Sequence, residues 1–250
     1  MTTFFTIVTI TYNSSKWVQE AVESVLTSEY SVFEYIICDD ASTDDTWEKI
    51  KLYKDDRIRS FRHDRNIGEY QNRNFALDKA KGKYLLFVDG DDVLYRDALG
   101  RIANYLEHFP EVGSIWGVPD KYIKQNALPL LLNPQQSMSW FYLANIRIAE
   151  IGFAETIFNV EILKQLGGFS TSFISGDTHV KKLIALEANV LLVKPGFVFW
   201  RISSNQASSK LKLHYNGYRN NVLIDREIIK AINKKNLDIE IKVIQRNILI

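Results

Sequence analysis

The residues best suited to chemistry are four consecutive ones, Asp89-Gly90-Asp91-Asp92, which follow the apolar run Tyr84–Val88. In extended geometry Asp89 and Asp91 are two residues apart and share one face of the chain. Crowded carboxylates repel one another unless they are protonated or hold a cation, and such oxygen ligands suit magnesium, manganese or calcium. Glycine between them lets a ligand's phosphates approach the backbone closely. This segment therefore predicts a site for a divalent cation and a phosphate-bearing ligand.

Two further polar clusters follow apolar runs, Thr11-Tyr12-Asn13 and Asp39-Asp40-Ala41-Ser42. In parallel α/β sheets, ligands bind beyond the carboxyl ends of the strands, so three such clusters could meet at one edge. Each cluster alone is also typical of an ordinary turn, because Asn, Asp, Gly and Ser are common in loops.

The elements that would carry these clusters alternate along the first 120 residues. Apolar runs predict strands at 5–11, 35–38, 58–61, 84–88 and 113–118. Between them, apolar residues at helical spacing predict helices at 17–26, from Ser42 as N-cap to about 53, at 69–81 closed by Gly82, and at about 95–108. Strand and helix alternation with buried strands predicts an α/β fold whose parallel sheet is covered on both faces.

The second half is less regular, with prolines at 119, 129 and 134 interrupting any long element. We expect a helix at 160–166 ended by Gly167-Gly168, a helix at 178–186, strands at 190–193 and 197–200, and a polar loop at 203–209. Residues 210–250 contain nine basic and four acidic side chains among Ile, Leu and Val. That segment could form an added helical layer, a partner-binding helix or a membrane-surface helix.

Composition excludes several classes of protein. The 250 residues carry 31 basic and 30 acidic side chains, so a net charge of +1 does not favour nucleic acid as a partner. One cysteine, Cys38, excludes a disulfide framework and a cysteine metal cage, and no apolar run approaches the roughly 20 residues of a membrane span. No basic segment precedes the Phe4–Ile10 run, so we expect no secretory signal and a soluble, cytoplasmic protein.

The charge is divided unevenly between the two halves. Residues 1–120 hold 14 basic and 21 acidic side chains, net −7, and residues 121–250 hold 17 and 9, net +8. These could be two solvated faces; alternatively, the basic half meets phosphates or an anionic membrane surface while the acidic half holds a cation.

A set of short motifs resembles the family 2 glycosyltransferases, which have the GT-A fold, over about the first 200 residues. In the order found in that family they are Ile7-Val8-Thr9-Ile10-Thr11-Tyr12-Asn13, Ala21-Val22-Glu23-Ser24-Val25-Leu26, Asp39-Asp40-Ala41-Ser42-Thr43-Asp44, Asn66-Ile67-Gly68, Arg73-Asn74, Phe87-Val88-Asp89-Gly90-Asp91-Asp92, and Gly167-Gly168-Phe169 before Gly176-Asp177. The resemblance implies a Rossmann-like, mostly parallel sheet flanked by helices. It implies a catalytic domain at 1–205, with a nucleotide-sugar half at 1–118 and an acceptor half at 119–205, then a flexible loop and a basic, helical extension at 206–250.

The resemblance further implies a nucleotide-sugar donor, most often a UDP-sugar. The loop Thr11–Asn13 would lie against the nucleoside, and Asp40 would accept a hydrogen bond from the uracil N–H, since an ionised carboxylate only accepts. Asp39 would orient the loop or a helix start. Arg73 falls where the family often has a basic residue near the donor, although a solvated helix residue is an equal reading.

The same resemblance assigns the chemistry. Asp91 would ligate a divalent cation, Mn or Mg, and Asp89 would face the ribose or the metal, with Asp92 supporting both. The sugar would pass with inversion to a hydroxyl of a glycan or lipid-linked saccharide in surface polysaccharide synthesis. Asp177 matches the general base, although an Asp before a helix is also a common N-cap. The basic C-terminal tail would suit contact with a membrane surface.

The sequence departs from the family pattern at several positions. Gly176 replaces a frequent Glu, and His179 replaces a second Asp. Ser203 stands where a His is frequent, leaving Asn205, Gln206 or His214 as possible substitutes. The segment 119–150 matches no known pattern, and its aromatic run Trp140-Phe141-Tyr142 could stack on a sugar ring or, more commonly, lie in the core.

Other classes fit less well. An aspartate-nucleophile phosphatase normally has Gly where Asp92 follows Asp91, and the chain has no Gly-x-Gly-x-x-Gly turn for a nicotinamide cofactor. The alternative that stays open is a catalytically silent sugar-nucleotide-binding or scaffold protein on the same fold, because fold does not determine function.

Overall fold

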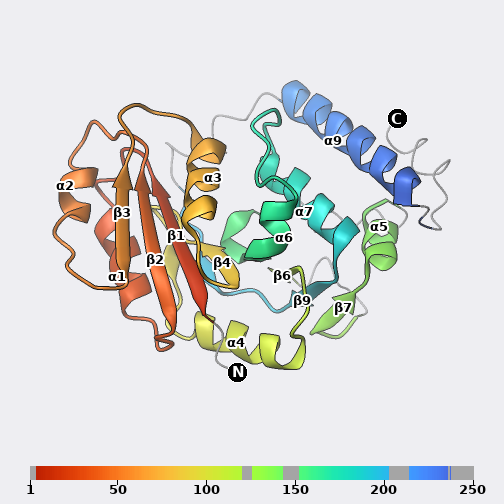
Figure 1. Ribbon diagram of the computed structural model, residues 1–250, viewed down its shortest axis with the longest axis horizontal. Coiled ribbons are helices and arrows are strands. Elements are labelled where there is room, and N and C mark those ends of the chain that lie inside the picture. The colour runs from red at the N-terminus through yellow and green to blue at the C-terminus, as the bar shows by residue number, and fades with distance from the viewer. Residues whose placement is uncertain (1–3, 120–125, 143–151, 203–213, 236, 238–250) are drawn as a thin grey trace.

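Eight strands form one mixed sheet in the order β3-β2-β1-β4-β8-β6-β9-β7 (Figure 1). The computed structural model describes residues 4–119, 126–142, 152–202, 214–235 and 237. The strands of the sheet are β1 (Phe5–Thr11), β2 (Phe33–Asp39), β3 (Ile58–Arg62), β4 (Tyr84–Phe87), β6 (Ser114–Gly117), β7 (Leu130–Leu132), β8 (Thr156–Asn159) and β9 (Val190–Val193). Two short strands, β5 (Val93–Leu94) and β10 (Val198–Phe199), form a separate antiparallel ribbon.

The N-terminal part of the sheet is parallel, as predicted. Strand β1 pairs in parallel with β2 on one side and β4 on the other, and all seven of its residues are buried. The register places Thr11 beside Asp39, so the ends of β1 and β2 carry two of the polar clusters to the same edge. The third cluster follows β4 at that edge.

The C-terminal part of the sheet is where the structure departs from a simple parallel order. Strand β8 lies between β4 and β6 and is antiparallel to both, and β7 is antiparallel to β9 at the edge. Neither strand was predicted. They contain only four and three residues, too few for a period to be recognised, and their pairing depends on neighbours far along the chain.

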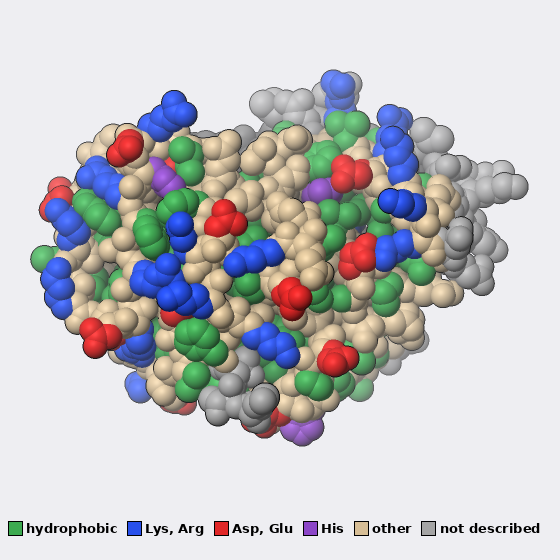
Figure 2. Space-filling model, in the orientation of Figure 1, with side chains coloured by type: hydrophobic (Ala, Val, Ile, Leu, Met, Phe, Trp, Pro, Cys, Tyr) green, Lys and Arg blue, Asp and Glu red, His purple; other side chains and the backbone are tan. Residues whose placement is uncertain are grey.

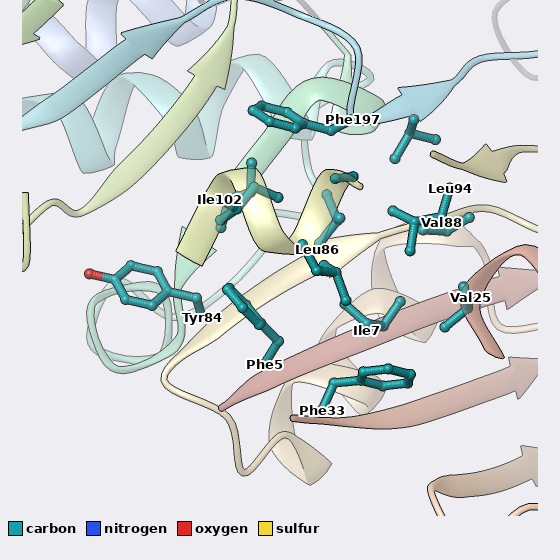
Figure 3. Packing of buried hydrophobic residues seen from close by; sticks show 14 of the residues in the cluster. Phe5, Ile7, Val25, Phe33, Tyr84, Leu86, Val88, Leu94, Ile102 and Phe197 are labelled. Carbon is teal, nitrogen blue, oxygen red and sulfur yellow. The ribbon is translucent and has the colours of Figure 1, made fainter. Parts of the chain in front are cut away.

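Helices cover both faces of the sheet. They are α1 (Val18–Leu26), α2 (Thr46–Ile50), α3 (Glu69–Lys79), α4 (Ala98–His108), α5 (Pro134–Tyr142), α6 (Val160–Gln165), α7 (Gly176–Glu187) and α9 (His214–Lys235), with a 3-10 turn, η3 (Phe153–Glu155). Apolar residues of α1 and α4 pack with one face of β1, as Figure 3 shows around Phe5 and Ile7. Residues of α3, α6 and α7 pack with Val8 and Ile10 on the opposite face.

Several predicted helix boundaries were wrong, and two of them concern residues named above as helix signals. Ser42 is not an N-cap: α2 starts at Thr46, and the Ser42 hydroxyl instead donates to Asp39. Gly82 does not close α3, which ends at Lys79. A Cβ at Gly82 would lie 2.5 Å from the Thr6 backbone nitrogen, so this glycine is required by close approach to β1.

The C-terminal helix α9 forms an added layer, one of the three readings of the basic tail. Four isoleucines of α9 lie in a cluster with Leu186 of α7 and Phe141 of α5, and they are Ile224, Ile228, Ile229 and Ile232. In the same cluster Phe141 and Tyr142 are buried, which supports the core reading of the aromatic run. Among the described residues, no helix is long and apolar enough to cross a membrane. Residues 238–250 of the tail lie outside the described residues.

Candidate functional site

The loop after β4 is fastened to the end of β1. The Gly90 amide donates to the Ile10 carbonyl (3.1 Å), and the Asp92 amide donates to the Asp89 carbonyl (2.9 Å). A Cβ at Gly90 would lie 2.6 Å from Thr11 Oγ1 and 3.2 Å from Ser14 Oγ. Gly90 therefore allows the loop to pack directly on the first polar cluster. This close packing gives a steric reason for glycine at position 90, besides the predicted access for a phosphate.

Arg73 is buried, with a side chain only 2% exposed, so the reading of a solvated helix residue was wrong. Its guanidinium donates to both carboxylate oxygens of Asp89 (3.0 and 2.7 Å) and to Glu69 (2.9 and 3.2 Å). It lies over the rings of Phe87 (4.5 Å) and Phe153 (3.8 Å). Burial by itself would lower the pKa of Arg73, but the charges of Asp89 and Glu69 more than offset burial and raise it. Asp89 is thus held in one orientation by a bidentate pair.

Asp92 is buried behind the same loop. Its Oδ1 accepts from the Arg201 amide (3.0 Å), and the Arg201 guanidinium donates to the Asp91 carbonyl (2.8 Å). Burial, followed by the charge of Asp89, raises the pKa of Asp92 to about 8. Asp92 therefore joins the loop to the segment after β10, and its support of the metal-binding residues stays a prediction.

The loops after β1 and β2 are joined by hydrogen bonds. The Asn13 amide donates to Ser42 Oγ (2.9 Å), and Asn13 Oδ1 accepts from the Thr43 amide (2.8 Å). Asn13 has a positive φ of 53°, which Asn tolerates better than most residues. Asp39 accepts from both the amide and the hydroxyl of Ser42, so it orients this loop as predicted. Tyr12 remains 48% exposed at the surface of the pair of loops.

Asp40 supports a third loop. Its two carboxylate oxygens accept from the amides of Ile67 (2.8 Å) and Gly68 (3.0 Å), just before α3 begins. Because a carboxylate has about four acceptor positions, it retains capacity for a further donor such as a uracil N–H. The predicted contact of Asp40 with the nucleobase stays a prediction.

Asp177 lies in the first turn of α7, whose N-cap is Ser175. The N-cap reading of Asp177 was therefore wrong, because the helix begins two residues earlier than expected. The adjacent Gly176 amide donates to the Tyr70 hydroxyl (2.9 Å), and Tyr70 lies on α3, three residues before Arg73. Helix α3 thus connects the Asp89 loop with the segment that carries Asp177.

Several residues of this site were not predicted. Glu69, Tyr70, Phe153 and Arg201 carry contacts that only the folded chain brings together. The one sequence signal was Gly176, at a position where the family often has Glu. Asn205 and Gln206 lie outside the described residues, as does the side chain of His214.

The donor set suits an open metal site rather than a closed cage. Among the described residues, no group of three or more His, Cys, Asp or Glu side chains is arranged to hold a metal ion. Magnesium, and manganese in a similar way, is usually held by one or two carboxylates while water and substrate phosphates supply the remaining ligands. Partly exposed Asp91, with Asp89 beside it, fits that arrangement.

Comparison with known proteins identifies the family. A sequence model of the family described as glycosyl transferase family 2 matches residues 6–165, more than half of the chain. The chain belongs to this family.

Two relatives are named as bacterial enzymes that transfer glucose or N-acetylglucosamine. The chain is 39% identical to UDP-Glc:alpha-D-GlcNAc-diphosphoundecaprenol beta-1,3-glucosyltransferase WfaP of Escherichia coli, over 40% of each chain. It is 31% identical to the poly(ribitol-phosphate) beta-N-acetylglucosaminyltransferase TarS of Staphylococcus aureus, over 49% of this chain and 24% of TarS. The matches thus span less than half the length of these relatives.

Solved structures confirm the fold class. A crystal structure of S. aureus TarS in complex with UDP-GlcNAc gives a TM-score of 0.71 at 23% identity, covering 94% of this chain and 68% of that chain. The mannosyltransferase PcManGT from Pyrobaculum calidifontis, in complex with GDP-Man and Mn2+, gives a TM-score of 0.68 at 20% identity, covering 92% of this chain and 65% of that chain. The α/β fold is that of these glycosyltransferases.

Replacing Arg73 by Met should destabilise the protein by about 3–5 kcal/mol, because Asp89 would lose its partner in a partly buried site. Urea unfolding followed by circular dichroism measures the difference. The matched control is Lys51→Met, which removes an ion pair that is 47% and 65% exposed and should change stability by no more than about 0.5 kcal/mol. Equal effects of the two variants would contradict a structural role for the Arg73–Asp89 pair.

Proposed function

We propose that this chain transfers a sugar, with inversion, from a UDP-sugar to a hydroxyl of a glycan or lipid-linked saccharide. The observation that carries the proposal is the arrangement on α3, which contacts both the Asp89 loop and the segment bearing Asp177. A donor site and a carboxylate base must face the same reacting carbon, and a helix that contacts both segments supports such an arrangement.

The donor half would bind the nucleotide at the edge where β1, β2 and β4 end. The loop Thr11–Asn13 would lie against the nucleoside, and Asp40 would accept from the base. Arg73 would act by holding Asp89, which faces the ribose or the cation. The names of WfaP and of the TarS complex include UDP-Glc and UDP-GlcNAc, which supports a UDP-sugar as donor.

A divalent cation would be held by Asp91, with Asp89 as a second ligand. Such a cation stabilises the negative charge that develops on the departing diphosphate. The Mn2+ in the PcManGT complex supports a cation in a protein of similar fold.

Asp177 would take the proton of the acceptor hydroxyl as that oxygen attacks the sugar carbon from the side opposite the departing UDP. Its carboxylate lies in the first turn of α7. Attack from the opposite side inverts the configuration at the carbon.

Asp91→Ala should remove the increase in UDP affinity that Mn2+ produces in the wild-type chain. The physical reason is that the carboxylate linking protein and cation would be lost. Calorimetric titration of UDP with and without Mn2+ measures this, and Asp78→Ala, an exposed carboxylate of α3, is the control. An Asp91→Ala protein with unchanged metal-enhanced binding would exclude Asp91 as the ligand.

Asp177→Asn should lower sugar transfer at least 100-fold and leave UDP affinity within twofold, because the amide keeps the shape but cannot accept the proton. Release of UDP from UDP-glucose and UDP-GlcNAc is followed with a synthetic GlcNAc-diphospholipid acceptor and with water alone. The control is Asp78→Asn, which makes the same charge change on α3. A wild-type chain that binds UDP but releases none from either donor would support the silent sugar-nucleotide-binding protein instead.

We also propose a cytoplasmic protein whose basic C-terminal segment contacts an anionic membrane surface. Exposed Arg226, Lys230 and Lys234 recur every four residues on the outer face of α9, beside Leu223, which is 51% exposed. Figure 2 shows Lys and Arg side chains at the upper right, where Figure 1 places α9. Basic side chains near an anionic surface contribute about 1 kcal/mol each.

Replacing the three basic residues together by Ala should therefore abolish co-sedimentation with vesicles containing half phosphatidylglycerol, and 0.5 M NaCl should weaken binding of the wild-type chain. The control carries three exposed lysines from other segments replaced by Ala: Lys54, Lys81 and Lys194. Equal binding to vesicles of pure phosphatidylcholine would contradict an electrostatic contact.

A further inference from the structure

The hydroxyl of Tyr70 joins α3 to the turn that precedes Asp177. It donates to the Ile174 carbonyl (2.9 Å) and accepts from the Gly176 amide (2.9 Å). One oxygen therefore bonds the backbone on both sides of Ser175, the N-cap of α7. Because the first amides of a helix have no partner within the helix, the Gly176 bond also satisfies a donor that the helix leaves open.

The ring of Tyr70 explains why residue 176 is glycine. A Cβ at Gly176 would lie 2.9 Å from Tyr70 Cζ and 3.0 Å from its Cε1, and 2.9 Å from the Ser170 carbonyl oxygen. The phenol thus fills the space where a side chain at 176 would begin. A side chain at 176, such as the Glu that the family resemblance implies at this position, would require both the Tyr70 ring and the Ser170 carbonyl to shift.

The phenol stays protonated at this position. Burial, and then the negative charges of Asp177 and Glu69, raise the pKa of Tyr70 well above its ordinary value. A neutral hydroxyl is both donor and acceptor, so it can make both bonds to the turn at any pH at which the protein would work.

Helix α9 holds the same turn from the other side. Asn220 Oδ1 accepts from the Ile174 amide (2.9 Å), so the two backbone groups of Ile174 are bonded to side chains of α9 and α3. Two residues after Asp177, His179 Nε2 lies 2.9 Å from Glu227 Oε1 of α9. Contacts between α7 and α9 continue to the C-terminal ends of both helices, where Lys235 Nζ donates to Glu187 Oε2 (2.6 Å).

We propose that Tyr70 is a positioning residue, which fixes the position of Asp177 relative to the Asp89–Arg73 pair. Asn220 of α9 holds the same turn, at residues 174–176, by a second hydrogen bond. The inference rests on the proposed role of Asp177 as base. Arg73 and Tyr70 lie one turn apart on α3, so the orientation of the donor carboxylate and the position of the base are set by the same helix. Misplacement of a catalytic group by about 1 Å can cost 100-fold in rate.

Tyr70→Phe tests the proposal because it removes the hydroxyl and keeps the ring. We expect kcat for UDP release to fall at least tenfold, with the KM for UDP-GlcNAc and the UDP dissociation constant within twofold of the wild-type values. Hydrogen exchange should become faster in peptides covering residues 174–178 but not in those covering 37–42. The matched control is Tyr53→Phe, which removes a tyrosine hydroxyl bonded to α1.

A second pair of variants tests the contribution of α9. Asn220→Ala removes the acceptor for the Ile174 amide and should lower kcat severalfold, whereas Asn220→Asp keeps an acceptor oxygen and should restore it. A contact that only stabilises the fold would change the unfolding midpoint of the variants, but it would not lower kcat while leaving the donor affinity unchanged.

The outcomes separate this inference from the proposed function. If Asp177→Asn abolishes turnover while Tyr70→Phe keeps kcat within twofold, the positioning role of Tyr70 is wrong and the base assignment stands. A parallel loss of UDP affinity in Tyr70→Phe would also overturn it, placing the hydroxyl in the donor site. If the wild-type chain turns over neither acceptor nor water, the proposed function fails. Unchanged hydrogen exchange at residues 174–178 in Tyr70→Phe would then show that the Tyr70 hydroxyl does not hold this turn.

Discussion

A buried guanidinium is the constraint on which the arrangement of the site depends. A cation that is almost fully removed from water must be paired and hydrogen-bonded, since desolvation is otherwise too costly. Arg73 meets this requirement with Asp89 and Glu69, between the rings of Phe87 and Phe153. The pairing fastens α3 to the loop after β4. Because α3 also contacts the start of α7, the same helix contacts both the proposed donor site and the segment that carries the proposed base.

The acidic residues at the edge of the sheet divide into different roles once their partners are known. Asp39, Asp40 and Asp92 accept hydrogen bonds from backbone amides and hold loops. Asp89 accepts from a guanidinium. Their crowding therefore does not by itself amount to a metal cage, and the proposed cation site depends on Asp91 and Asp89 with further ligands from the substrate. Most of the acidic side chains at this edge serve to hold the loops around it.

The C-terminal helix α9 has an apolar face and a basic face, and its sequence alone did not show which surface the apolar face would contact. Its isoleucines pack against α7 and α5, while its arginine and lysine side chains face outward. A basic amphipathic segment has the same pattern whether it covers its own domain, a partner or a membrane, because only the apolar stripe is encoded and not the surface that it meets. The structure decided that the stripe of α9 is covered by the domain itself.

The alternation of elements, the buried parallel strands and the three polar clusters at their ends could all be predicted from the sequence. These follow from local periods and from the geometry of parallel sheets, which brings the ends of neighbouring strands to one edge. The ordered motifs also identified the family. Three features depend on the folded chain: the antiparallel insertion of β8, the burial of Arg73 and the packing of Tyr70 on Gly176. Each of these joins residues far apart in the chain, the last pair by 106 positions. A local pattern carries no information about such a partner, and a glycine gives no sign of which side chain will occupy the space beside it.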